Sequence, residues 1–403
     1  MSSPVVTLPR YSRAVPPLDP VAARQQAVRR RLNAAWGLLY LNTMTFIVGP
    51  SILHLPSKVG KGVAQGALPL AIVILLTINP KLKLRPNVFL CIVSLLGVDA
   101  ILTAIAVHHL GTEFRTFRLV EYVFALWLTT PFWNRRDMLL LKIHLRWLYI
   151  ALGTVLLGLM VAPGRAFAYN GGRLIGTIWP MYPTQIAQYA AVAAGLTVVL
   201  WLGRQVSGRM TLAGVAFAIL LLLLTHTRTA LVGLVAGILV AGLSLFISNA
   251  RVRKFFATGA VIVSIGVLTA AGFITTWLAR GESTQGLTSL TGRTNFWALV
   301  LNTPRDKFQE IFGFGLSNAS VNGLPIDSNW LSSYMQEGLV GVAVCGAILV
   351  YLFLASLFQP PGVRRALILF ILTYVTIASF TEDAFTDVST YLLHLVIAAS
   401  LFV

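Results

Sequence analysis

The chain has 403 residues, of which 57% are hydrophobic and only 11% are charged, and its mean hydropathy is +0.79. Soluble domains carry about a quarter charged residues, so this composition excludes a soluble globular enzyme and predicts an all-α integral membrane protein with several spans. Thirty-one Lys and Arg against 13 Asp and Glu suit loops at an anionic membrane surface, so we expect membrane lipids and not nucleic acid as partners.

The first predicted segment is polar. Residues 1–33 contain several Pro and Arg residues and lack the apolar segment of a secretory signal peptide. We expect a cytoplasmic basic arm here, followed by a polytopic membrane domain over residues 34–403. Arg29, Arg30 and Arg31 directly precede the first apolar run, where they are suited to anchor it against anionic lipid.

Twelve apolar stretches follow, most of them near the roughly 20 residues needed to cross the hydrocarbon core, the fourth and the last being short. Cys91 and Cys345 lie inside two of these runs, so we expect neither a disulfide nor a metal site. The predicted spans are 34–53, 63–79, 87–107, 119–133, 145–162, 183–202, 210–226, 229–248, 256–278, 330–357, 366–380 and 388–403.

Basic residues are distributed unequally between alternate loops. Of the 31 Lys and Arg residues, 20 fall on the side that holds residues 1–33 and 11 fall on the other side. Because basic residues resist translocation, both termini are predicted to be cytoplasmic. Residues 163–182 and 279–329 then form extracytoplasmic loops, the longer one lying between the ninth and tenth spans, and we expect the active site in these loops.

Three arginines on the predicted external side are not explained by this charge bias. Arg228 lies in a tight turn between two apolar spans, Arg173 precedes the sixth span, and Arg293 begins a short helix expected on the outer surface. Guanidinium groups stay charged and bind phosphate oxygens through paired hydrogen bonds, so the three together predict an anion site suited to a lipid diphosphate. For Arg228 the structural alternative is snorkelling to lipid head groups, and for Arg173 and Arg293 it is a loop cation.

The segments around these arginines resemble a known family. In their order along the chain they are similar to motifs of the O-antigen ligase and O-antigen polymerase superfamily, whose members share a many-spanning helical fold. The resemblance covers residues 165–345 in motifs and the whole chain in topology. The motifs are Gly172 to Thr177, Thr227 to Ala230, Gly292-Arg293 with Trp297, Gly313-Phe314-Gly315, and Asp327 to Leu331 running on to Gly341.

The resemblance implies an activity. Members of the family transfer a glycan from a polyprenyl-diphosphate donor to an acceptor hydroxyl at the outer face of the bacterial cytoplasmic membrane, without a metal or a nucleotide sugar. For this chain it implies the same donor, a glycan or lipid-glycan acceptor and no cofactor. It also implies that Arg228 and Arg293 bind the diphosphate leaving group with help from Arg173. The other expected substrate-binding residues are Thr177, His226, Trp297 and Asn329.

Asp327 is the expected general base. Ligases of the family typically carry His at the matching position, so the resemblance favours a polymerase over a ligase. A carboxylate there can accept the proton of a hydroxyl that attacks an anomeric carbon with inversion. N-capping of the tenth span is the structural alternative for Asp327.

The remaining acidic residues leave alternatives open. Asp99 and Glu121 lie within predicted spans, and we expect them to face the bundle interior because a carboxylate in lipid is costly. Glu382, Asp383 and Asp387 cluster between the last two spans, where they could receive acceptor hydroxyls or form structural ion pairs. A transporter or flippase of an anionic lipid-linked substrate is the alternative function, although its arginines would line a path at mid-membrane depth.

Overall fold

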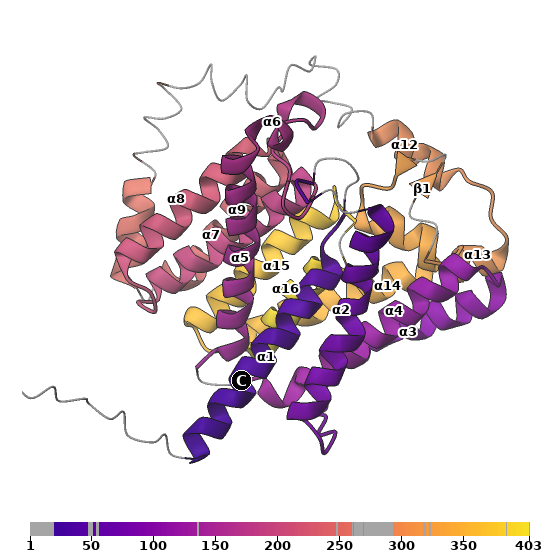
Figure 1. Cartoon of the computed structure of the whole chain (residues 1–403), viewed down its shortest axis with the longest axis horizontal. Helices are drawn as coiled ribbons and strands as arrows, with labels where there is room; N and C mark the ends of the chain where they lie inside the picture. The colour runs from indigo at the N-terminus through magenta and orange to yellow at the C-terminus, as the bar shows by residue number, and fades with distance from the viewer. Residues whose placement is uncertain are drawn as a thin grey trace, which may run out of the picture.

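The computed structural model is a helical bundle (Figure 1). A two-stranded hairpin, in which β1 (Ser320–Val321) pairs antiparallel with β2 (Leu324–Pro325), is the sheet in the described part of the chain. The prediction of an all-helical protein is therefore confirmed in its class. The structure describes residues 20–46, 51–53, 56–134, 137–246, 249–259, 261, 269, 293–316, 320–321, 324–383 and 385–402.

The helices are α1 (Pro20–Thr43), α2 (Ser57–Ile78), α3 (Val88–Val107), α4 (Leu110–Thr129), α5 (Leu139–Val161), α6 (Pro163–Ala166), α7 (Pro183–Leu202), α8 (Gly208–Leu224), α9 (Arg228–Phe246), α12 (Arg293–Leu301), α13 (Lys307–Phe312), α14 (Asn329–Leu357), α15 (Val363–Ser379) and α16 (Thr390–Ser400). Two 3₁₀ turns, η1 (Thr130–Phe132) and η2 (Asn170–Gly172), complete the assigned helical elements.

Six of the described helices, α2, α3, α5, α7, α9 and α14, are long and apolar enough to cross a membrane by length and composition. The helices α8 and α16 are apolar but shorter. The predicted spans 119–133 and 366–380 coincide largely with α4 and α15, whereas the predicted span 34–53 overlaps α1 only over residues 34–43. Most of the predicted span 256–278 lies outside the described residues, so the count of twelve stays a prediction.

Several helices begin earlier than predicted, α1 and α4 by the most. Helix α1 starts at Pro20, inside the expected basic arm, because residues 21–32 are mostly Ala, Arg, Gln and Leu and proline suits a first helical position. Helix α4 starts at Leu110, nine residues before the expected span. Its first turns carry polar side chains, and the imidazole of His109 caps it by accepting from Gly111 N at 3.2 Å.

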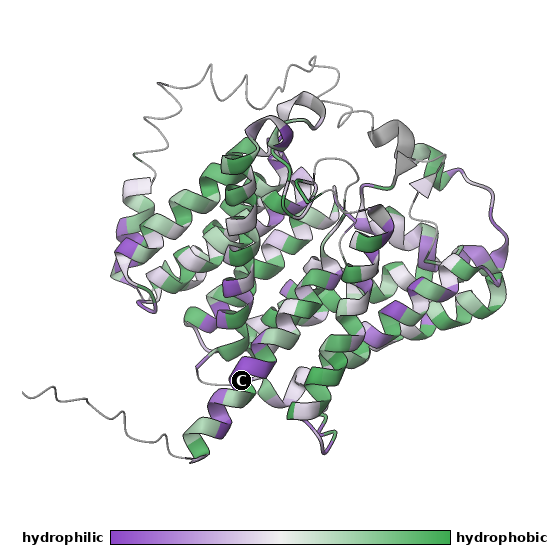
Figure 2. Cartoon of the chain, in the orientation of Figure 1, coloured by the Kyte–Doolittle hydropathy of each residue, from purple (hydrophilic) through white to green (hydrophobic). Residues whose placement is uncertain are grey.

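Helix α7 occupies the interior of the bundle. In its apolar window 94% of the residues are buried, whereas the corresponding share in the other five candidate spans is 33% to 50%. It packs against α5, α8, α9 and α15. Figure 2 shows green, hydrophobic residues along the middle of most helices and purple, hydrophilic ones gathered near several helix ends and loops. The exposed apolar faces of the outer helices are therefore suited to lipid.

Helix α14 is interrupted at Gly338, where φ is 63° and ψ is −156°. This break leaves the carbonyls of Met335 and Gln336 without their helical donors, and both are paired from outside the helix. Phe314 N donates to Met335 O and Gly315 N donates to Gln336 O, each at 2.9 Å. The break thus fixes residues 313–315 against the beginning of α14.

We expect Gly338→Ala to lower the stability of the folded protein by about 1–3 kcal/mol, because its backbone conformation is one that only glycine adopts readily. A Cβ at this position would also meet the backbone of Ile311. Gly346→Ala is the matched control in the same helix, since an added Cβ there meets nothing within 4 Å. Thermal unfolding of the detergent-purified protein should show a lower midpoint for Gly338→Ala alone; equal midpoints would contradict the strain at Gly338.

Candidate functional site

A cavity of about 690 Å³ lies among the ends of α1, α4, α7 and α16, the first turns of α2 and the loop of residues 380–389. Helix α1 ends at the cavity and α16 begins there, so Pro20 and Phe402 lie at the opposite end of the bundle. A helix of 24 residues spans about 36 Å. The lining residues are Asn42, Thr43, Met44, Thr45, Phe46, Lys61, Ala64, Gln65, Gly111, Phe114, Arg115, Arg118, Tyr182, Thr184, Gln185, Gln188, Glu382, Asp383, Asp387, Val388, Ser389, Thr390 and Tyr391.

Arg118 lines this cavity, and the end of α1 holds its side chain in place. Its Nη2 donates to Asn42 O at 2.8 Å and to Asn42 Oδ1 at 3.2 Å, and its Nε donates to Asn42 Oδ1 at 3.3 Å. Asn42 is itself fixed, because its Nδ2 donates to Ala64 O at 2.9 Å. These acceptors are neutral, so the positive charge of Arg118 is positioned without being neutralised by them.

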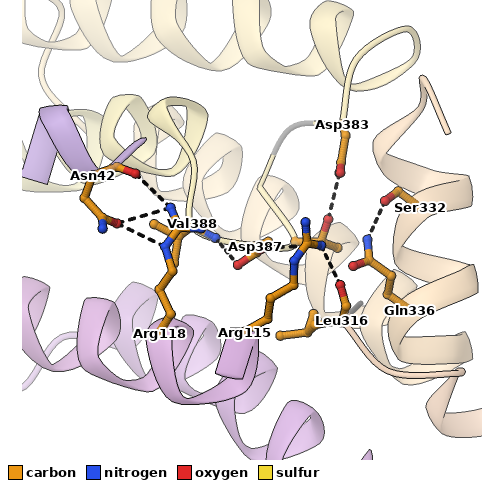
Figure 3. Close-up of polar contacts among 10 residues, drawn as sticks. Asn42, Arg115, Arg118, Leu316, Ser332, Gln336, Asp383, Asp387 and Val388 are labelled. Atoms are coloured by element: carbon orange, nitrogen blue, oxygen red, sulfur yellow. Dashed lines mark hydrogen bonds and ion pairs between the residues drawn. The ribbon is translucent and has the colours of Figure 1, made fainter. Parts of the chain in front are cut away.

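Arg115 lies one turn before Arg118, on the same face of α4 (Figure 3). Its Nη1 donates to Leu316 O at 2.6 Å and lies 3.8 Å from Asp387 Oδ2. Leu316 follows the residues that pair with the interrupted helix α14. Arg115 is therefore positioned by the same segment that repairs the break at Gly338, and the ion pair with Asp387 joins α4 to the loop 380–389.

Asp383 and Asp387 face this cationic pair from the loop 380–389. Thr386 Oγ1 donates to Asp383 Oδ1 at 3.1 Å, and Val388 N donates to Asp387 Oδ1 at 2.6 Å. The Asp383 side chain is exposed, and it lines the cavity. Desolvation by the surrounding protein, and secondarily the charge of Asp387, raise the pKa of Asp383 to about 6, against the lowering effect of nearby hydroxyls and Arg115.

Amide and aromatic side chains complete the cavity. Gln185 accepts from Thr45 N at 3.0 Å and from Thr45 Oγ1 at 2.7 Å, and its Nε2 donates to Thr43 O at 3.0 Å. Gln188 Nε2 is buried and has no hydrogen-bond partner among the described residues. Tyr182 and other aromatic rings line the same space. Amides, carboxylates and rings together can bind the hydroxyl groups and apolar faces of a sugar.

The structure brings two of the sequence-predicted arginines to one turn. Arg173 Nε donates to Thr225 O at 2.9 Å and its Nη2 donates to Thr227 Oγ1 at 3.1 Å. Arg228 follows directly, at the start of α9, and is half-buried. His226 lies in the same turn with a positive φ of 51°. Arg173 thus stabilises the turn that carries His226 and Arg228.

Two contacts connect these elements with the loop 380–389. The hydroxyls of Thr229, in the first turn of α9, and Thr381 are 2.8 Å apart. Asn329, the first residue of α14, accepts from Phe385 N at 2.7 Å through its Oδ1. The starts of α9 and α14 therefore both fix the loop that carries the carboxylates of the cavity, and Asn329 acts here through the backbone of that loop.

The remaining predicted residues lie elsewhere. Asp327 is half-buried before α14, and the N-cap position of this helix is Ser328, so the capping alternative for Asp327 is not what the structure shows. Thr177 is buried against Gly158 at the end of α5, with no partner for its hydroxyl among the described residues. Trp297 is half-buried on α12.

Of the eight predicted site residues, the seven whose side chains the structure describes do not line the cavity of about 690 Å³. For Arg293 the structure describes the backbone at the start of α12, and its side chain lies outside the described part. No group of three or more His, Cys, Asp or Glu side chains able to hold a metal ion occurs among the described residues.

Sequence reasoning missed Arg115 and Arg118. It counted both as external cations but gave neither a role, because they belong to no motif and precede the predicted fourth span. A signal was present: Thr112, Arg115 and Arg118 recur every three residues and, with Tyr122, define a polar stripe on α4.

We expect inorganic pyrophosphate to raise the thermal unfolding midpoint of the purified protein, since it offers the anionic oxygens that paired guanidinium groups bind. In Arg115→Gln and Arg118→Gln its apparent affinity should fall about tenfold or more, given the worth of a charge-assisted hydrogen bond. Arg146→Gln is the control, because Arg146 lies on α5 away from this cavity. Equal shifts in all three variants would contradict an anion site at the α4 arginines.

Comparison of the chain with protein-family models gives no match, and comparison with curated proteins gives none either.

Proposed function

We propose that the protein is an integral membrane glycosyltransferase that transfers a glycan from a polyprenyl-diphosphate donor to an acceptor hydroxyl. The observation that carries this proposal is the pairing, in one cavity, of Arg115 and Arg118 with the carboxylates of the loop 380–389. Glycosyl transfer from a lipid diphosphate needs cations at the leaving group and a base at the acceptor, and this cavity provides both.

In the proposed reaction, Arg118, Arg115 and Lys61 bind the diphosphate oxygens. Arg118 is suited to this role because Asn42 fixes its guanidinium without cancelling its charge. The acceptor hydroxyl gives its proton to a carboxylate of the loop, for which Asp383 is the leading candidate. Its oxygen forms a bond to the anomeric carbon while the bond from that carbon to the phosphate oxygen breaks. The electron pair leaves with the polyprenyl diphosphate, and the anomeric centre is inverted.

The residues implied by the family resemblance form a second, distinct assignment within the same proposal. Arg228 and Arg293, helped by Arg173, would bind the diphosphate, with Asp327 as the base. The contacts of Thr229 and Asn329 with the loop 380–389 give this assignment a structural connection to the cavity. Parallel substitution of the two arginine sets separates the two assignments.

The proposal includes a membrane topology. It has twelve spans, cytoplasmic termini and a long extracytoplasmic loop over 279–329. In this topology the cavity lies at the outer face of the cytoplasmic membrane of a bacterium, where lipid-linked glycans are used. The Asp at position 327 favours a polymerase over a ligase. A transporter or flippase would instead carry its binding site near the bilayer midplane, whereas this cavity lies at the ends of its helices.

We expect Arg118→Gln and Arg115→Gln to lower kcat/KM for glycan transfer about 100-fold or more, because each removes a donor that stabilises the leaving group. The measurement is incubation of the detergent-purified protein with a polyprenyl-diphosphate oligosaccharide, with the products resolved by size. Arg228→Gln run in parallel tests the second assignment, and Arg146→Gln should keep full activity. A ladder on the same lipid identifies a polymerase, and single transfer to an added acceptor identifies a ligase. Absence of any product from intact donor would overturn the glycosyltransferase proposal.

The rate of transfer should fall about tenfold per pH unit below pH 6, because Asp383 with a pKa of about 6 must be deprotonated to accept a proton. Above pH 6 the carboxylate form dominates and the rate should level off. Asp383→Asn should lose most of the activity together with this acidic limb in kcat/KM. An unchanged acidic limb in Asp383→Asn would assign the titration to another group.

A further inference from the structure

Two carboxyl groups lie inside the helix bundle without partners. Asp99, on α3, is 2% exposed, and Glu337, on α14, is 0% exposed. All four of their carboxyl oxygens are buried and have no hydrogen-bond partner among the described residues. Neither residue lines the cavity of about 690 Å³, and neither has a role in the proposed glycosyl transfer.

The packing of α3 against α14 brings the two carboxyl groups into electrostatic reach of each other. Thr103, one turn after Asp99, donates to Phe312 O at 3.1 Å through its Oγ1. The next residue, Gly313, packs directly on the backbone of Gln336 and Glu337. These two contacts therefore connect the turn that carries Asp99 with the turn that carries Glu337.

A space in α14 accommodates the carboxyl group of Glu337. A Cβ added at Gly341 would lie 2.8 Å from Glu337 Oε2 and 2.9 Å from Ser333 Oγ. The Glu337 side chain therefore folds back along its own helix, over the bare Cα of Gly341 and beside Ser333. Any larger residue at position 341 would occupy the place of this carboxyl group.

The charged groups around Glu337 are acidic. Asp99 faces it from α3, and Asp383 and Asp387 face it from the loop 380–389. The nearby cation Arg115 makes its hydrogen bond with Leu316 O and its ion pair with Asp387. The thiol of Cys345, which lies one turn after Gly341 on α14, adds no positive charge. No described residue forms a salt bridge with either carboxyl group, so ionising both would place two bare negative charges in a medium of low dielectric constant.

We propose that Asp99 and Glu337 form a buried proton-binding pair that holds at least one proton at neutral pH. A bound proton removes the charge that the protein does not neutralise and lets one carboxyl group donate a hydrogen bond. This proposal is independent of the glycosyltransferase proposal, since proton binding by the pair needs neither the glycan donor nor the acceptor hydroxyl.

The test uses N,N′-dicyclohexylcarbodiimide, an apolar reagent that modifies protonated carboxyl groups, on the full chain in detergent between pH 6 and pH 9. Peptide mass spectrometry locates the adducts. We expect labelling of Asp99 or Glu337 at pH 7 that declines as the pH rises. Asp137 is the internal control: it pairs with Arg29 at the surface and should remain unlabelled at pH 7.

Two variants measure the coupling within the pair. In Glu337→Gln the pH midpoint for labelling Asp99 should fall by about one unit or more, because the repulsion from Glu337 is gone, and Asp99→Asn should do the same for Glu337. Asp137→Asn should change neither midpoint. If a variant fails to fold, the pH series on the wild-type protein still tests the proposal by itself.

Three results would overturn the proposal. The first is no adduct on either carboxyl group at pH 7, and the second is midpoints that are the same in wild type and both folded variants. The third is an adduct suppressed by sodium chloride but not by choline chloride of equal ionic strength, which would identify a metal cation in place of the proton.

Discussion

Backbone polar groups inside a bilayer have to be paired within the protein, and the candidate site depends on how one interruption of a helix meets this requirement. Helix α14 breaks at Gly338, and the freed carbonyls of Met335 and Gln336 are paired by the segment that follows α13. The next residue of that segment is Leu316, whose carbonyl fixes Arg115. The pairing of these α14 carbonyls thus determines the position of the Arg115 side chain of α4.

The loop 380–389 is the second element on which the site depends. It is held by hydroxyls at Thr229 and Thr381, by Asn329 on α14, and by Tyr122 on α4, whose hydroxyl donates to Ser389 O at 3.2 Å. These contacts come from three helices that are far apart in sequence. A short connection that would otherwise be free to move is therefore fixed, and its carboxylates face the arginines of α4 in a defined arrangement (Figure 3).

Sequence reasoning predicted the class of fold well because the apolar runs are long and the requirement for helices in a membrane is strict. One inward-facing residue was also predicted: Asp99 is buried, as expected for a carboxylate in a span. The cavity was not predicted. Its arginines belong to a helix whose polar first turns were assigned to a loop. Their partners Asn42, Leu316 and Asp387 come from segments at least 76 residues away, which no local pattern indicates.

The nearly complete burial of α7 has a consequence for how the protein is made. A segment that faces protein on all sides can carry Gln185, Gln188 and Thr197, which would be costly against lipid. Three of the helices that cover it, α8, α9 and α15, are synthesised later, and α15 belongs to the last tenth of the chain. During synthesis the polar side chains of α7 are therefore uncovered until these helices have been made. A chain that stops before residue 363 leaves this helix without the cover of α15.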